Sequence, residues 1–214
     1  MTDIDTDTFL ETIEDENRTP LSRLGSSKSL YAATEGDIDT EPVLRAAADA
    51  EYAAWRTFEN WADDEPHDGA RQAFAAAASD ERDHYETVTD HLKDDHDPET
   101  AETPALHEYL RGREDTASRL GGLLGRILAS DRSKSQTVGF FVGSADPRTA
   151  QVFRDFGDDL ETQREATLEV LSTVCESEDD WNRAQDAATG AIEAAYGEYV
   201  ETLEGLGANP KPVC

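Results

Sequence analysis

Apolar side chains recur at three- and four-residue spacing along most of this chain, and that spacing restricts it to helices. The spacing gathers apolar side chains on one face of an α-helix, whereas a half-buried strand requires strict alternation. Residues 137–142 form the one segment rich in β-formers, and their apolar positions also fit a helical stripe. The sequence therefore predicts an all-α protein.

Helix starts are marked where a Thr or Asp precedes a proline, as at Thr19-Pro20, Thr103-Pro104 and Asp146-Pro147. The first residue of such a pair caps the helix, and the proline tolerates the first helical position because it needs no amide hydrogen there. Together with the apolar stripes, these signals predict helices over residues 7–16, 20–34, 41–63, 69–94, 104–111, 114–143, 147–174 and 178–205.

The lengths of the connections predict how the four long central helices are joined. Connections of about five and four residues predict two antiparallel hairpins, 41–94 and 114–174. The segment of about twenty residues between them predicts one long crossover rather than a simple up-and-down order. We expect three regions: a helical extension (1–40), a four-helix bundle (41–174), and a C-terminal helix with a tail (175–214).

The chain is strongly acidic, with 48 acidic and 19 basic residues and a formal net charge of -29. That charge repels nucleic acids and anionic membranes, so neither is an expected partner. A disordered acidic chain and a folded protein with a carboxylate shell both fit this composition, but the periodic apolar residues favour the folded protein. High Asp and Glu with few Lys resembles proteins of salt-accumulating archaea, in which salt screens self-repulsion.

The chain offers no membrane span and no disulfide framework. It contains no run of about 18 apolar residues. The acidic start MTDIDTDTF lacks a secretory signal pattern, so we expect a cytoplasmic protein. Its two cysteines form neither a disulfide framework nor a zinc motif. We expect Cys175 to be a buried apolar residue and Cys214 to be an exposed thiol.

Three ionisable residues fall in the middle of apolar stripes. Glu51 interrupts the stripe of the helix predicted over 41–63, and Glu81 and His84 interrupt that of 69–94. At a spacing of three residues, Glu81 and His84 point the same way. A carboxylate on an apolar face is costly unless it is paired or coordinated. These are the parts of half a carboxylate-bridged dimetal site.

The second hairpin carries a similar pattern. Asp131 and Glu161 are 30 residues apart, as are Glu51 and Glu81. This correspondence predicts an internal duplication in which Glu51 faces Asp131, with Arg164 opposite His84. The candidate metal ligands are therefore the three residues of the first hairpin and two of the second: Glu51, Glu81, His84, Asp131 and Glu161.

Over residues 41–174 the chain resembles the rubrerythrin branch of the ferritin-like superfamily. That family has one Glu on each of two helices and a Glu-x-x-His on each of the other two. Glu51 matches the first Glu, Glu81 with His84 matches one Glu-x-x-His, and Asp131 matches the second Glu weakly. Glu161 matches only the first residue of the second motif. The resemblance implies a mono- or dinuclear iron site, acting on peroxide or dioxygen with a separate electron donor.

Two departures from the family pattern support another hypothesis. Arg164 stands where the second histidine belongs and cannot ligate a metal. Lys134 lies three residues after Asp131, on nearly the same face. These two cations could replace the metal charge, which would leave a buried ion-pair network in a helical scaffold or partner-binding protein without cofactor. Iron handling without turnover is a third hypothesis, and a homodimer stays open.

The remaining histidines and tyrosines receive structural interpretations. The histidines outside the stripes are expected to be solvated on loops or flanks: His67, His91, His96 and His107. The tyrosines on helical stripes are expected to be core or boundary aromatics: Tyr52, Tyr85, Tyr196 and Tyr199.

The acidic composition yields a prediction about salt. The free energy of unfolding should fall sharply at low ionic strength, because unscreened carboxylates repel one another in the compact state. Thermal unfolding in dilute buffer and in molar potassium chloride measures this. An equal or higher midpoint in dilute buffer would contradict it.

Overall fold

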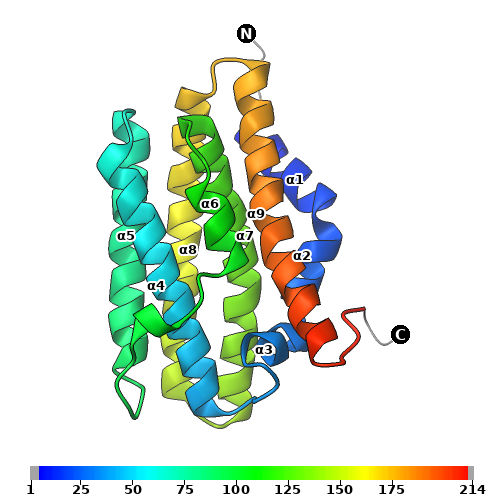
Figure 1. The fold of residues 1–214 in the computed structure, drawn as a ribbon. Coiled ribbons are helices and arrows are strands. Elements are labelled where there is room, and N and C mark those ends of the chain that lie inside the picture. Colours follow the sequence, from blue (N-terminus) through cyan, green and yellow to red (C-terminus); the bar gives the residue numbers. More distant parts are fainter. Residues whose placement is uncertain (1–4, 212–214) are drawn as a thin grey trace.

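A computed structural model describes residues 5–211 of the chain, and within them every regular element is helical (Figure 1). The elements are α1 (Thr6–Glu16), α2 (Arg18–Leu24), α3 (Ser27–Ala33), α4 (Thr40–Asp64), α5 (Asp68–Thr89), the short 3-10 helix η1 (Pro98–Thr100), α6 (Ala105–Arg111), α7 (Thr116–Gly143), α8 (Pro147–Val174) and α9 (Glu178–Gly205). The prediction of an all-α bundle is confirmed.

Two predicted helix boundaries are wrong. The helix expected over 20–34 is two helices, because Ser26 adopts an extended backbone between α2 and α3. The helix expected over 69–94 ends at Thr89. There the Thr89 hydroxyl donates to the carbonyl of Glu86, and such local bonds compete with helix continuation.

The four long central helices form two hairpins joined by one crossover. Residues 65–67 connect α4 to α5, and residues 144–146 connect α7 to α8. Ion pairs from Glu51 to Lys134 and from Glu65 to Arg119 show that α4 and α7 run antiparallel. Helix α5 is therefore parallel to α7, and residues 90–115, which include η1 and α6, return along the length of the bundle (Figure 1). This is the predicted topology.

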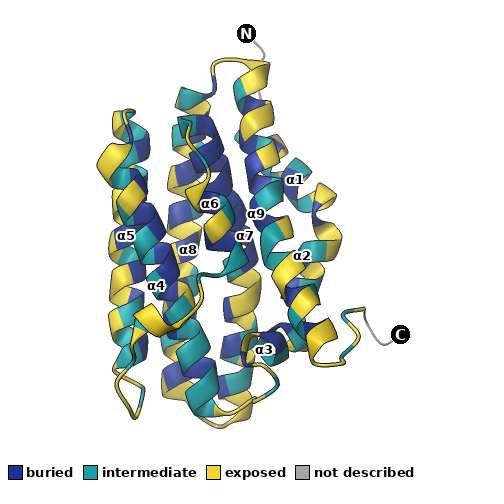
Figure 2. Ribbon diagram, viewed as in Figure 1, coloured by how far each residue is buried: buried dark blue, intermediate teal, exposed yellow. Residues whose placement is uncertain are grey.

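Helix α9 lies on the far side of α7 in unusually close contact. A Cβ at Gly121 or Gly125 would overlap the backbone carbonyls of Ala184 or Ala188 in α9. Only glycine lets two helix backbones approach this closely. Consequently α7 lies between α8 and the bundle on one side and α9 on the other, and its residues 117–129 are buried around the full circumference (Figure 2).

The N-terminal helices extend the same core. Phe9 of α1 packs edge-on against Trp181 of α9, with ring centroids 4.8 Å apart. Asn17, between α1 and α2, donates its amide hydrogen to Thr189 of α9 at 3.0 Å. The largest apolar cluster contains residues from α1, α2 and α4 through α9. Helices α1, α2 and α9 therefore share one hydrophobic core with the bundle.

The contact between α7 and α9 predicts the effect of adding a methyl group. Gly125→Ala should lower the free energy of unfolding by about 1–3 kcal/mol, because the new Cβ pushes α9 away from α7. Gly139→Ala in the same helix is the matched control, since a Cβ there meets no atom within 4 Å. The control should raise stability by about 1 kcal/mol through helix propensity. Denaturant unfolding measures both, and equal effects would contradict the packing argument.

Candidate functional site

The structure brings together three of the five predicted ligands. Glu51 from α4 and Glu81 and His84 from α5 are buried, with side chains 2%, 0% and 4% exposed. One potential donor atom of each lies within 4.8 Å of the others. The position of the three residues on their apolar stripes therefore predicted their convergence correctly.

Two buried cations from α7 hold the carboxylates. The Arg126 guanidinium donates two hydrogen bonds to Glu81, at 2.6 and 2.7 Å to its two oxygens. Lys134 donates to Oε1 of Glu51. Arg126 also lies 3.6 Å from Oε2 of Glu51. Two carboxylates thus face two cations in the centre of the bundle, and their formal charges cancel.

The electrostatics of the cluster follow from burial and from these pairings. Burial raises the pKa of Glu81, but the Arg126 charge and the nearby His84 side chain outweigh it and hold that pKa well below 4.5. Burial also raises the pKa of Glu51, and the Lys134 charge offsets this only in part, so that pKa stays above 4.5. Burial lowers the pKa of Arg126, but Glu81 reverses the effect, so the guanidinium stays charged.

His84 connects the cluster to the protein surface. Its Nε2 lies 2.9 Å from Asp159 of α8, whose side chain is half exposed. Its ring stacks on Phe156, with centroids 3.9 Å apart. Its Nδ1 faces Oε2 of Glu81 at 3.7 Å and Oε2 of Glu51 at 4.0 Å. Burial lowers the pKa of His84, but the nearby carboxylates of Glu81 and Glu51 outweigh it and raise that pKa above 6.5.

The residues present do not fit a dimetal centre. Both oxygens of Glu81 are occupied by Arg126, and Oε1 of Glu51 by Lys134. Among the potential ligand atoms of the cluster, Oε2 of Glu51 and Nδ1 of His84 have no hydrogen-bond partner in the described part of the chain. A divalent ion between them would add two charges to a buried site that is already neutral, which is costly in a medium of low polarity.

The two ligands predicted on the second hairpin are not in the cluster. Asp131 and Glu161 are exposed, so the expectation that Glu51 faces Asp131 is wrong. Arg164 is not opposite His84 either, because it pairs with Glu161 at 3.2 Å on the surface of α8. The reason is helical phase: the 30-residue match placed both acids one position away from the buried faces of α7 and α8.

Sequence reasoning missed Arg126, the cation that holds Glu81. Residues 120–129 of α7 are buried on every side, and all of them except Arg126 are apolar or glycine, so periodicity does not single out the face directed at α5. One signal was available, because Arg126 is the only charged residue in that run. Gln163 was also missed: it is buried on the α8 stripe and its amide lies 3.4 Å from Oε1 of Glu81.

The side chains of two of the four histidines expected to be solvated are enclosed. The ring of His107 in α6 is enclosed and donates to the hydroxyl of Thr57 at 3.2 Å, since that hydroxyl already donates to the carbonyl of Ala53. The side chain of His96 is 5% exposed. The crossover folds back onto α4, and its sequence pattern gave no sign of this.

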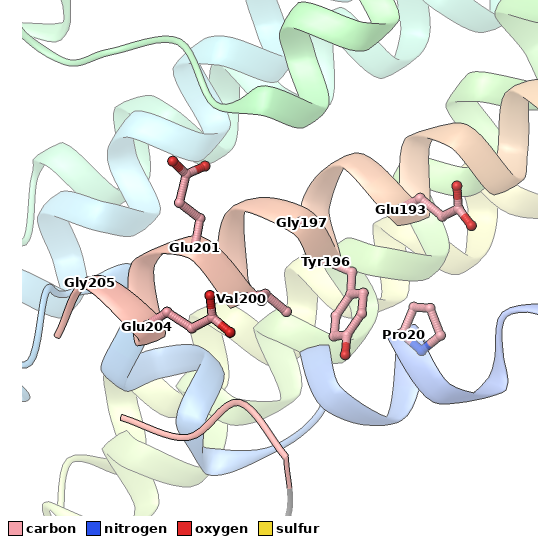
Figure 3. Close-up of a pocket in the computed structure, with 8 residues that line it drawn as sticks. All are labelled: Pro20, Glu193, Tyr196, Gly197, Val200, Glu201, Glu204 and Gly205. Atoms are coloured by element: carbon pink, nitrogen blue, oxygen red, sulfur yellow. The ribbon is translucent and has the colours of Figure 1, made fainter. Parts of the chain in front are cut away.

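A groove lies away from the cluster, between α2 and α9 (Figure 3). Its volume is about 730 Å³, and its lining includes no basic residue. Tyr196 and Pro20 project toward each other across it, while Glu193, Glu201 and Glu204 line its length on α9. A groove with this lining disfavours anionic ligands.

Comparisons with known proteins yield no relative. No family model, no curated protein and no solved structure matches the chain. Among the helices of residues 5–211, none is both long enough and apolar enough to cross a membrane. The interpretation of the cluster therefore rests on its own geometry.

Burial of His107 predicts a pH dependence of stability. Burial, with the nearby Arg126 charge, lowers the pKa of His107 from 6.5 to about 3. Between pH 6.5 and pH 3 the unfolded chain binds a proton that the folded protein does not. The free energy of unfolding therefore decreases as the pH is lowered, by up to about 1.4 kcal/mol per pH unit. His107→Gln removes the proton-binding group and with it this contribution to the pH dependence. Denaturant unfolding from pH 7 to 5 should show a shallower slope for the variant, and equal slopes would contradict the assignment.

Proposed function

We propose that this chain is a metal-independent helical scaffold or partner-binding protein, in which a buried ion-pair network takes the place of a metal centre. The observation that carries the proposal is the pairing of Arg126 with both oxygens of Glu81 and of Lys134 with Glu51. A dimetal centre needs these carboxylate oxygens as ligands. Here they accept hydrogen bonds from cations that belong to the chain itself.

The charge balance supports the proposal in energetic terms. Two buried carboxylates without partners would be strongly destabilising. A metal-binding protein resolves this with the charge of its ions, so it tends to lose stability when they are removed. In this chain Arg126 and Lys134 supply two positive charges covalently. We therefore infer that the bundle folds fully without metal.

The network also selects how the helices assemble. Its members come from α4, α5 and α7, and α4 contacts α7 mainly through long side chains rather than close backbone approach. A shift of one helix would leave at least one charge buried and unpaired. The cost of that state favours a single register of the bundle, which suits a protein that presents a fixed surface.

A second candidate function is a single metal ion held by Glu51 and His84. The observation in its favour is that Oε2 of Glu51 and Nδ1 of His84, which lie 4.0 Å apart, lack hydrogen-bond partners among the described residues. We favour it less because it offers only two protein ligands and adds positive charge to a buried site where Arg126 and Lys134 already balance the two carboxylates.

The scaffold proposal predicts a specific pattern of stability. Arg126→Met should lower the free energy of unfolding by about 3–5 kcal/mol, because it leaves Glu81 buried without its partner. The double variant Arg126→Met with Glu81→Leu should recover most of that loss, since apolar residues can replace a buried pair at little cost. Denaturant unfolding of the parent, both single variants and the double variant measures this.

Metal analysis separates the two candidates. Protein incubated anaerobically with ferrous iron and then desalted should retain no stoichiometric metal, and its stability should not change with iron. Retained iron is also measured in Lys134→Ala, which removes the cation bound to Glu51. If the parent retains about one iron per chain, and His84→Ala releases it, the metal candidate is correct and the scaffold proposal is wrong.

A further inference from the structure

A second hydrogen-bonded chain of ionisable groups lies where the crossover meets the α4–α5 hairpin. The phenol oxygen of Tyr85 on α5 is 3.2 Å from Nδ1 of His96, and Nε2 of His96 is 2.8 Å from Asp49 on α4. None of these three residues is part of the ion-pair network described above. The His96 side chain is almost fully enclosed, whereas Asp49 and Tyr85 at either end of the chain of bonds are partly exposed.

The partners of His96 determine which atom donates and which accepts in each hydrogen bond. Nε2 of His96 donates to the Asp49 carboxylate, which can only accept when ionised. Nδ1 of His96 then carries a lone pair and accepts the phenolic hydrogen of Tyr85. A carboxylate on one side of an imidazole fixes its tautomer and stabilises the imidazolium that forms when the ring takes a proton. His96 is therefore a base directed at the Tyr85 hydroxyl.

Tyr85 belongs to a cluster of three aromatic rings. The ring of Tyr85 lies 5.4 Å from Tyr52 and 6.2 Å from Trp55 between centroids, and Tyr52 and Trp55 are 5.7 Å apart. All three residues are half-buried, so small molecules can reach them. The other two tryptophans, Trp61 and Trp181, are enclosed in the core. These three rings therefore form an accessible aromatic cluster in which one hydroxyl, that of Tyr85, is hydrogen-bonded to an imidazole base.

Other tyrosines with a hydrogen-bonded hydroxyl lack such a base. Tyr109 donates to the carbonyl of Asp186, and Tyr199 to the carbonyl of Pro210, which cannot take up a proton at neutral pH. Tyr52 donates to the carboxylate of Glu99 at 2.7 Å. A carboxylate is a weaker base than an imidazole. Tyr85 is therefore the phenol in this set with the strongest proton acceptor.

We propose that Tyr85 is a redox-active tyrosine that gives one electron to a diffusible oxygen- or nitrogen-centred radical, directly or through Trp55, while its phenolic proton moves to His96. The O–H bond of Tyr85 breaks and an N–H bond forms at Nδ1 of His96. The electron reduces the attacking radical to its anion. Tyr85 becomes a neutral phenoxyl radical, and Asp49 balances the charge of the new imidazolium.

The protonation state of the phenol favours this coupled route over loss of the proton beforehand. A tyrosine hydroxyl keeps its hydrogen at neutral pH. Oxidation of a protonated phenol produces a very strong acid that must release its proton at once. A hydrogen-bonded base accepts that proton without any rearrangement, as positioned proton acceptors do in catalysis.

Pulse radiolysis of the full chain tests the proposal. Azide radicals oxidise tryptophan and tyrosine side chains, and optical absorption follows the conversion of tryptophanyl into tyrosyl radical within the protein. We expect fast conversion in the parent and loss of most of the tyrosyl signal in Tyr85→Phe. His96→Gln keeps a hydrogen-bond acceptor but removes the base, so it should slow the conversion roughly 10²-fold. Tyr109→Phe is the matched control and should behave as the parent.

The experiment also separates this proposal from a purely structural role. If the bonds of His96 only hold the crossover against α4, His96→Gln would accelerate proteolysis within residues 90–104 and leave the radical kinetics unchanged. Asp49→Asn, which leaves the bond between Tyr85 and His96 in place, should slow the conversion by a smaller factor. Circular dichroism verifies helix content in each variant. Parent-like kinetics in both His96→Gln and Asp49→Asn, or an undiminished tyrosyl signal in Tyr85→Phe, would overturn the proposal.

Discussion

The bidentate pair between Arg126 and Glu81 is the interaction on which the centre of this bundle depends. Glu81 is fully enclosed, and a carboxylate in that position requires a partner with matching charge and geometry. Arg126 provides both, since its planar fork donates to each oxygen. Lys134 does the same for one oxygen of Glu51. Together they neutralise a site that would otherwise need metal ions, and this neutrality underlies the proposed metal-independent scaffold.

Arg126 can occupy this position because α7 is enclosed from two sides. On one side α9 packs directly against Gly121 and Gly125, with no room for a side chain between the backbones. On the other side Arg126 extends toward α5 and pairs with Glu81, which is buried on an apolar helix face. The close packing of α9 therefore removes solvent from α7 and raises the energetic importance of the ion pair. The added C-terminal helix and the charged centre are physically linked.

The crossover contributes more than a connection between hairpins. It places His107 of α6 against α4 and His96 against Tyr85, so both imidazoles are enclosed. Each enclosed imidazole has fixed hydrogen-bond partners from the protein, whereas a solvated imidazole would be bonded to water. One becomes a neutral structural donor, and we propose that the other serves as a proton acceptor for a redox-active tyrosine.

Local sequence signals determined most of the fold. Apolar spacing and capping residues placed the long helices within a few residues, because these signals act within one or two helical turns. Connection lengths indicated the two hairpins and the crossover. The same spacing identified Glu51, Glu81 and His84, since an ionisable residue on an apolar stripe is visible in sequence.

Tertiary structure alone decided which residues meet those three. Asp131 and Glu161 share the spacing of Glu51 and Glu81 but are exposed, because the phase of each helix about its axis depends on its neighbours. The residues around Arg126 are apolar or glycine on all sides of α7, so no periodicity could show which side faces α5. Periodicity reports the face that a single helix buries, whereas a charge balance across three helices depends on how they rotate and slide against one another as they pack.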